Sequence, residues 1–135
     1  MGKSTKPRIF IIEDEADIIE LYELAFEENG LELESAMTGK DGLAKLKAFA
    51  KKEAPRPDLI LLDLLLPDIS GIEIIKELKT MKEIKDIPFI ILTNYGSGQI
   101  QRLTEDENLK DIPYFIKIEI TPQRLVEIVK KKLNL

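Results

Sequence analysis

The chain of 135 residues contains neither cysteine nor histidine. Without cysteine there can be no disulfide, thiol nucleophile or cysteine-bound zinc, and nothing indicates an oxidising compartment. Without histidine the chain lacks the most common general base and transition-metal ligand of proteins. Any chemistry must therefore depend on carboxylates, hydroxyls, lysines and the backbone.

Long apolar segments and a broad basic surface are also missing. No segment approaches the roughly 20 apolar residues of a membrane span, and the polar start of the chain has no apolar stretch of signal-peptide length. The net charge of −5 argues against direct binding of nucleic acid, because such binding needs lysine and arginine at the phosphates. We therefore expect a cytoplasmic protein that contacts neither membrane nor nucleic acid.

Hydrophobic residues make up 44% of the sequence, which is enough for one core. We expect a single domain over residues 1–135, with residues 1–6 as a polar N-terminal extension. Apolar or alternating runs of strand length alternate with segments of helical periodicity. The expected strands lie within 8–13, 31–37, 57–63, 87–93 and 112–117, and the expected helices within 16–29, 38–49, 70–81, 99–108 and 121–133.

Helix boundaries are marked by capping residues. Thr38, Ser70 and Thr121 are expected N-caps, and Glu73 completes a capping box with Ser70. The helix predicted over 99–108 has the least apolar support. We assign two further acids, Asp58 and Asp68, to turn and capping roles.

Five strands alternating with five helices are typical of an α/β, doubly wound fold with a parallel sheet, because parallel strands need crossovers and right-handed crossovers cover both faces. In such a sheet the carboxyl ends of the strands share one edge, where sites form. The residues expected at that edge are Glu13, Asp14, Asp63, Thr93 and Lys117.

Three carboxylates in one crevice repel one another unless a cation binds among them. Magnesium prefers oxygen ligands and takes only one or two carboxylates, so the set predicts a Mg²⁺ site. A carboxylate can also attack phosphorus, with a metal ion and a lysine neutralising the charge. Asp63, which ends a buried apolar run, is the candidate nucleophile.

In this order and spacing the chain resembles the receiver domain of two-component response regulators, the CheY-like superfamily. The matching residues are the pair Glu13-Asp14, Asp63 followed by Leu66-Pro67 and Gly71, Thr93 after Ile91-Leu92, and Tyr114 three residues before Lys117. The resemblance covers nearly the whole chain. It implies a flavodoxin-like sheet of order 2-1-3-4-5, an order for which the same family is a standard example.

The resemblance also implies a function, a phosphorylation-operated binding switch. Asp63 would accept a phosphoryl group from a phosphohistidine on a sensor histidine kinase or phosphotransfer protein. The chain would be no enzyme beyond catalysing its own phosphorylation and dephosphorylation. A downstream partner would bind the face formed by the fourth helix, fifth strand and fifth helix.

Further site roles follow from the same resemblance. Asp14 and Asp63, with the backbone carbonyl of Leu65, would ligate Mg²⁺, and Glu13 would hold it through water. Lys117 would pair with Asp63 and then with the phosphoryl oxygens. The remaining roles concern the switch: Thr93 would donate its hydroxyl to the phosphoryl group, and Tyr114 would turn inward as Thr93 moves.

Some positions depart from the usual family pattern. Asn94 stands where a small residue is common, and Leu65 and Tyr95 occupy positions that tune phosphoryl lifetime. Neither Leu65 nor Tyr95 can activate water, so we expect slow self-dephosphorylation. Ile118 replaces the usual proline after Lys117, and a cis bond before a non-proline residue costs about 2.5 to 4 kcal/mol.

Other functions are compatible with parts of the pattern. An aspartyl-phosphate phosphatase would need a second carboxylate where Leu65 stands, and a flavin-binding domain is disfavoured by the acidic loop after the first strand. A receiver-shaped interaction module that is not phosphorylated remains the main alternative.

Overall fold

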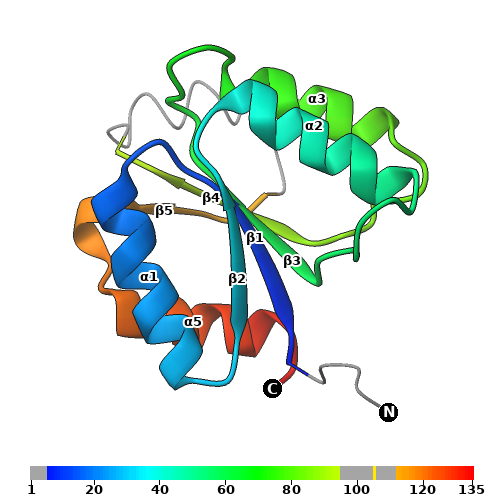
Figure 1. The fold of residues 1–135 in the computed structure, drawn as a ribbon. Coiled ribbons are helices and arrows are strands. Elements are labelled where there is room, and N and C mark those ends of the chain that lie inside the picture. Colours follow the sequence, from blue (N-terminus) through cyan, green and yellow to red (C-terminus); the bar gives the residue numbers. More distant parts are fainter. Residues whose placement is uncertain (1–5, 95–104, 106–111) are drawn as a thin grey trace.

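The computed structural model describes residues 6–94, 105 and 112–135. They form a five-stranded parallel sheet of order β2-β1-β3-β4-β5 (Figure 1). The strands are β1 Arg8–Ile12, β2 Glu32–Ala36, β3 Leu59–Leu62, β4 Phe89–Thr93 and β5 Tyr114–Ile116. Both the parallel sheet and the strand order that the resemblance implied are confirmed.

Four α-helices lie within the described residues, together with one short 3₁₀ helix. They are α1 Ala16–Glu28, α2 Gly39–Ala50, α3 Gly71–Thr80 and α5 Pro122–Lys132, with η1 at Lys117–Glu119. The helix expected over 99–108 lies outside the described residues. None of the helices in the described part of the chain has the length and apolar character needed to cross a bilayer.

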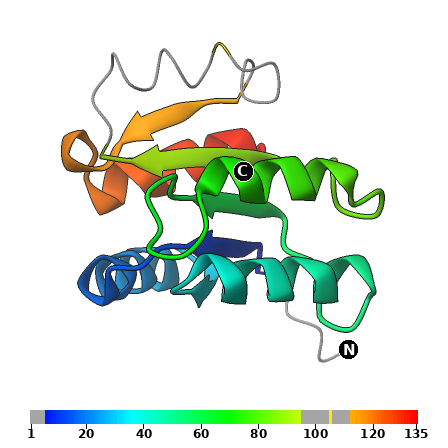
Figure 2. The same cartoon turned by 90° about the horizontal axis from the view of Figure 1, so that it is seen from above.

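The helices cover the sheet from both sides, α2 and α3 on one face and α1 and α5 on the other (Figures 1 and 2). Side chains alternate between these two cores because successive residues of a strand point to opposite faces. In β1, Phe10 and Ile12 pack toward α2 and α3, whereas Ile9 and Ile11 pack toward α1 and α5. Burial on both faces explains the near-continuous apolar runs of β1, β3 and β4.

The edge strand β2 is only partly buried, as its alternating sequence predicts. Its acids face cations of neighbouring elements: Glu34 pairs with Lys45 of α2 at 3.3 Å, and Glu32 with Arg8 of β1 at 3.7 Å. These half-exposed pairs keep one face of β2 polar while Leu33 packs against the other core.

The three predicted N-caps are confirmed. Thr38 accepts a hydrogen bond from the N–H of Asp41 at 3.0 Å, and Thr121 from that of Arg124 at 3.1 Å. Ser70 accepts from the N–H of Ile72 at 3.2 Å, one residue earlier than a capping box requires.

The C-termini of α1, α2 and α5 share one geometry, in which a residue with positive φ follows the helix and two backbone hydrogen bonds close the last turn. In α2 these bonds run from Glu53 to Ala48 (2.8 Å) and from Lys52 to Phe49 (3.1 Å). The positive-φ residues are Gly30 (75°), Lys52 (61°) and Asn134 (61°). Of these three residues Lys52 is the least suited to this conformation, since its Cβ crowds the following carbonyl and it lacks the short polar side chain of Asn134.

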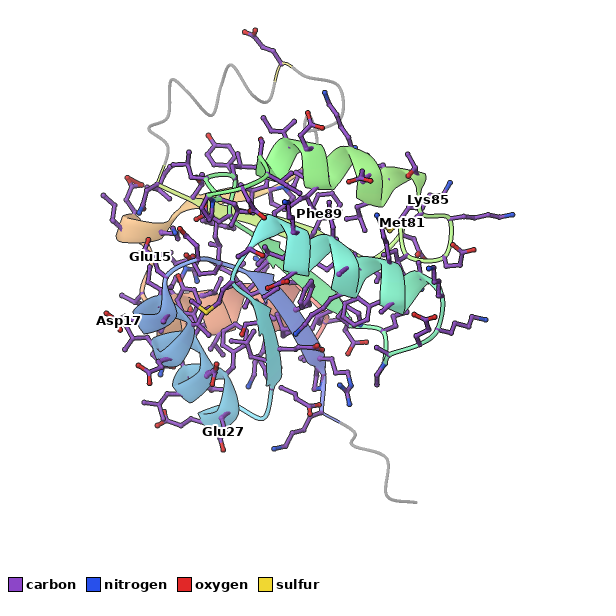
Figure 3. All side chains as sticks on the ribbon, turned by 45° about the horizontal axis from the view of Figure 1, so that its top comes forward. Glu15, Asp17, Glu27, Met81, Lys85 and Phe89 are labelled. Carbon is purple, nitrogen blue, oxygen red and sulfur yellow. The ribbon has the colours of Figure 1, made fainter. Side chains whose placement is uncertain are left out.

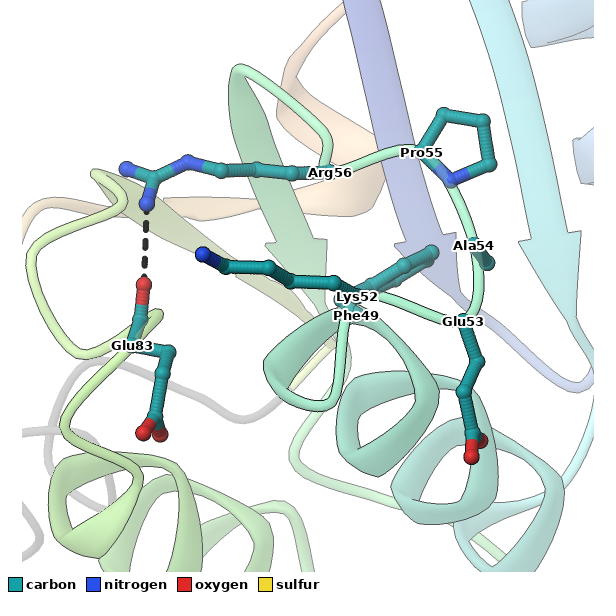
Figure 4. A pocket seen from close by; sticks show the side chains of 7 residues that line it. All are labelled: Phe49, Lys52, Glu53, Ala54, Pro55, Arg56 and Glu83. Carbon is teal, nitrogen blue, oxygen red and sulfur yellow. Dashed lines mark hydrogen bonds between the residues drawn. The ribbon is translucent and has the colours of Figure 1, made fainter.

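Figure 4 shows Lys52 at this turn, extending beside Arg56, whose guanidinium donates to the Glu83 carbonyl at 2.9 Å. We expect Lys52→Gly to raise the free energy of unfolding by about 1 kcal/mol, because glycine adopts positive φ without the Cβ cost. Urea unfolding followed by circular dichroism measures this. The matched variant Lys51→Gly, at φ −85°, should lower stability instead, and a destabilised Lys52→Gly would contradict the assignment of strain.

Candidate functional site

Two acids follow β1 and β3 directly and are fixed by an extension of the sheet. The N–H of Glu13 donates to Ala36 at 3.0 Å, and the N–H of Asp63 donates to Ile12 at 3.1 Å. Both side chains are buried, with exposed fractions of 1% for Glu13 and 3% for Asp63. The carboxyl edge of the sheet thus holds two carboxylates away from bulk water.

The ammonium of Lys117, the first residue of η1 after β5, lies between these acids. Its Nζ is 2.9 Å from Glu13 Oε1 and 2.9 Å from Asp63 Oδ2. It also lies 3.4 Å from Glu15 Oε1. The pairing of Lys117 with Asp63 agrees with the sequence expectation, and the additional contacts make Lys117 the centre of a three-carboxylate network.

Burial and ion pairing shift the pKa values of these groups in opposite directions. Burial raises the pKa of the Asp63 and Glu13 carboxyls above their ordinary values, and hydrogen bonds from Lys117 only partly offset it. Burial alone would lower the pKa of Lys117, but its hydrogen bonds to Asp63 and Glu13 outweigh this and raise the pKa. Lys117 therefore stays charged, and the two acids gain from any further positive charge.

A third acid, Asp14, completes a group that could hold a metal ion. Ligand oxygens of Glu13, Asp14 and Asp63 lie within 4.8 Å of one another, and Asp14 is exposed. With Glu15, four ionised carboxylates would face the one ammonium of Lys117, an excess of three negative charges. Oxygen ligands with that excess fit a hard divalent cation such as Mg²⁺.

The loop after Asp63 is held tightly. The N–H of Leu65 donates to Asp63 Oδ1 at 3.0 Å, and the N–H of Gly71 donates to the Leu64 carbonyl at 3.1 Å. A Cβ on Gly71 would lie 2.6 Å from the Asp63 carbonyl oxygen and 2.7 Å from Leu64 Cα. Both neighbours are backbone atoms, so only glycine permits this approach.

The other predicted residues occupy different environments. Thr93 is fully buried at the end of β4, opposite Ile116 in the ladder. Tyr114 begins β5 and is 39% exposed. Asn94 is exposed directly after Thr93, whereas Tyr95 lies outside the described residues. No peptide bond between described residues is cis, so Lys117–Ile118 is trans.

Glu15 is a site residue that the sequence pattern did not identify. Glu15 occupies the N-cap position of α1 without a side-chain cap, contacts Lys117, and donates its N–H to Glu13 Oε2 at 3.0 Å. The only signal for this role in the sequence was its place next to Glu13 and Asp14.

Comparisons with known proteins agree with this fold. A sequence model of the response regulator receiver domain matches residues 9–130. The phosphate regulon transcriptional regulatory protein PhoB of Escherichia coli (strain K12) is 34% identical over 123 residues, covering 91% of this chain and 50% of PhoB. The response regulator SaeR of Staphylococcus aureus (strain USA300) is 33% identical over 85 residues, covering 63% and 33%.

Solved structures give the same result. A CheY-like receiver domain protein from Methanospirillum hungatei JF-1 has a TM-score of 0.77 and 28% identity, covering 96% of this chain and 95% of its own. The receiver domain of a histidine kinase from Syntrophus aciditrophicus has a TM-score of 0.77 and 26% identity, covering 95% and 90%.

The fold and the acidic site are those of a receiver domain, the signalling module of two-component response regulators. The chain belongs to the response regulator receiver domain family. It spans about half the length of PhoB and about a third of SaeR.

Asp68 connects the loop after Asp63 to the first turn of α2. Its Oδ1 accepts from the N–H of Gly39 at 2.7 Å, and its Oδ2 from that of Lys40 at 2.9 Å. These are the first two residues of α2, so the predicted capping role holds, but for a helix that begins 29 residues earlier in the chain. The hydrogen bonds, that from Lys40 most, hold the pKa of Asp68 below its ordinary value of 3.8.

A lowered pKa in the folded state means that ionised Asp68 stabilises the fold above pH 3.8, and that this contribution is lost as pH falls through the lowered value. We expect Asp68→Ala to lower the urea midpoint at pH 7. The difference from wild type should shrink as the pH falls below 3.8. Asp68→Asn, which keeps one acceptor oxygen, should lose less. Equal midpoints for wild type and Asp68→Ala at pH 7 would contradict the capping role.

Proposed function

We propose that Asp63 accepts a phosphoryl group from the phosphohistidine of a sensor histidine kinase or phosphotransfer protein. The observation that carries the proposal is the 2.9 Å contact between the buried Asp63 carboxylate and Lys117. In the transfer, an Asp63 oxygen bonds to phosphorus while the bond from phosphorus to the histidine nitrogen breaks, and the histidine leaves as imidazole. Lys117, already within reach, would neutralise charge on the phosphoryl oxygens.

The proposed reaction depends on Mg²⁺ held by Asp14, Asp63 and the Leu65 backbone carbonyl. When bound, the ion would neutralise phosphoryl charge beside Lys117. The exposed Asp14 offers a ligand from the solvent side. Glu13, which accepts hydrogen bonds from Lys117 and from the Glu15 N–H, would hold the ion through water.

The phosphorylated domain would change the surface it offers to a downstream protein. Thr93 would donate its hydroxyl to the phosphoryl group, and Tyr114, now partly exposed on β5, would turn inward. The affected face would comprise the segment expected as the fourth helix, β5 and α5. The chemistry would be limited to the phosphorylation and dephosphorylation of the chain itself.

Residues 1–135 would act as one receiver domain, with residues 1–6 as a polar extension. The protein would work in the cytoplasm, where it would meet its kinase, and away from the membrane. With a net charge of −5 it would not itself bind nucleic acid. The relative PhoB is named a transcriptional regulatory protein, but this chain covers only 50% of it.

The proposal predicts that the protein, incubated with Mg²⁺ and a small phosphodonor such as acetyl phosphate, gains one phosphoryl group by intact mass. Asp63→Asn should abolish the gain because no carboxylate remains to attack phosphorus. The control Asp58→Asn, at the opposite edge of the sheet, should label like wild type. No uptake under conditions that label other receivers would favour the unphosphorylated interaction module, and turnover of phosphate esters would favour a phosphatase.

Phosphoryl lifetime gives a second prediction. Leu65 is 45% exposed but apolar, and neither it nor Tyr95 can activate water for attack on phosphorus. Loss of label from isolated phosphorylated protein should therefore be slow, and about tenfold or more faster in Leu65→Asn, Tyr95→Glu. Asn94→Ala, measured alongside, would show whether the amide at this position also affects the rate. An equal or slower loss in the double variant contradicts the role of these positions.

A further inference from the structure

A pocket lies where α2 ends and β3 begins, at the edge of the sheet opposite to Asp63. It is enclosed by the turn after α2, the connection into β3 and the connection from α3 to β4 (Figures 3 and 4). Its volume is about 530 Å³, within the range of roughly 300 to 1,000 Å³ that small-molecule sites occupy. The residues that line it are Phe49, Lys52, Glu53, Ala54, Pro55, Arg56 and Glu83.

Part of the pocket wall is apolar and held in place by the core. Phe49 is 3% exposed and packs edge-to-face against Phe10, with the ring centroids 5.2 Å apart. Ala54 and Pro55 continue this wall, and the ring of Pro55 fixes its own φ. Such a wall can receive the apolar part of a small molecule without rearrangement.

Two cations, Lys52 and Arg56, border the apolar wall. The Arg56 guanidinium is anchored: Nη1 donates to the Glu83 carbonyl at 2.9 Å, and Nη2 to Asp86 Oδ1 at 3.3 Å. These contacts use two of its five N–H donors, so donors remain for a ligand. The Lys52 ammonium has no hydrogen-bond or ion-pair partner among the described residues.

The lining contains two acids as well, but their carboxylates are directed elsewhere. In Figure 4 the side chains of Lys52 and Arg56 extend in the same direction. The carboxylates of Glu53 and Glu83 point away from the Arg56 guanidinium, which Glu83 contacts with its backbone carbonyl. The pocket therefore gathers its positive charge at one end.

The backbone of Lys52 is an independent reason to assign a role to this side chain. Its φ of 61° is a conformation that glycine adopts without cost and lysine does not. Strained residues of this kind are concentrated at ligand-binding and other functional sites. A lysine kept at a strained position, with its ammonium unpaired within the described part of the chain, points to a ligand that supplies the partner.

We propose that this pocket binds a small organic anion. A carboxylate or phosphate group of the ligand would lie between the Lys52 ammonium and the Arg56 guanidinium, and the ligand's apolar body would lie on the wall that includes Phe49. Arginine binds the oxygens of either group with a planar fork of donors, and lysine adds a point charge. The site does not depend on the proposed phosphorylation of Asp63.

NMR titration of the full chain, followed by ¹⁵N–¹H correlation spectra, tests the proposal. The probes are phenyl phosphate and benzoate, which carry a phosphate or a carboxylate on an apolar ring. EDTA is present so that no divalent cation draws them to Asp63. We expect saturable shifts of the backbone amide signals of Lys52, Glu53 and Arg56, with a dissociation constant of about 1 to 10 mM. Uncharged benzyl alcohol should bind about tenfold more weakly or not at all.

Matched variants separate the role of Lys52 from net charge and from misfolding. Lys52→Gln should weaken binding of the anions about tenfold, because a charged hydrogen-bond donor is lost. Lys51→Gln changes the net charge equally, but Lys51 does not line the pocket, so this variant should bind like wild type. Lys52→Gly should be more stable than wild type and still lose affinity, a combination that misfolding cannot produce. Lys52→Arg keeps the charge and should keep the binding.

Three results would overturn the proposal. The first is the absence of saturable shifts at these amides with both anions, and the second is benzyl alcohol binding as tightly as the anions. The third is equal affinity of the Lys52→Gln and Lys51→Gln proteins. Binding of only one anion supports the proposal and identifies the head group as a carboxylate or a phosphate.

Discussion

The ammonium of Lys117 between Asp63 and Glu13 is the interaction on which the site depends. Burying one carboxylate in a protein is costly, and burying two side by side is more so, unless a cation and hydrogen bonds compensate. Lys117 supplies that compensation at 2.9 Å to each acid, and the N–H groups of Glu15 and Leu65 occupy the other oxygens. The acids remain short of positive charge, as their raised pKa values indicate.

This network exists only because of the sheet topology. Lys117 lies 104 residues from Glu13 and 54 from Asp63 along the chain. Parallel strands place all their carboxyl ends at one edge, and the order β2-β1-β3-β4-β5 puts the ends of β1 and β3 next to each other. The near-continuous apolar runs that bury the central strands on both faces therefore bring the charged groups together.

The difference between local patterns and non-local contacts also explains how much of the structure the sequence could predict. Apolar runs and caps are local, so the strands, the described helices and the residues at the carboxyl edge were predictable from the pattern. Strand order is not local, and it came only from the family resemblance. The contact of Glu15 with Lys117 and the cap that Asp68 provides for α2 depend on three-dimensional placement, and no spacing along the chain encodes either of them.

The loop from Asp63 to Gly71 shows why those non-local contacts matter for a switch. One end is tied to Asp63 itself by the Leu65 N–H, and the other is pressed against the backbone of Asp63 and Leu64 at Gly71. Between them Asp68 holds the first turn of α2. The Leu65 N–H binds Oδ1 of Asp63 and Lys117 binds Oδ2, so a group added to either oxygen would disturb one of these two contacts. Movement of the loop would either break its hydrogen bonds from α2 or carry the start of α2 with it, which connects the surface beside α2 to the site.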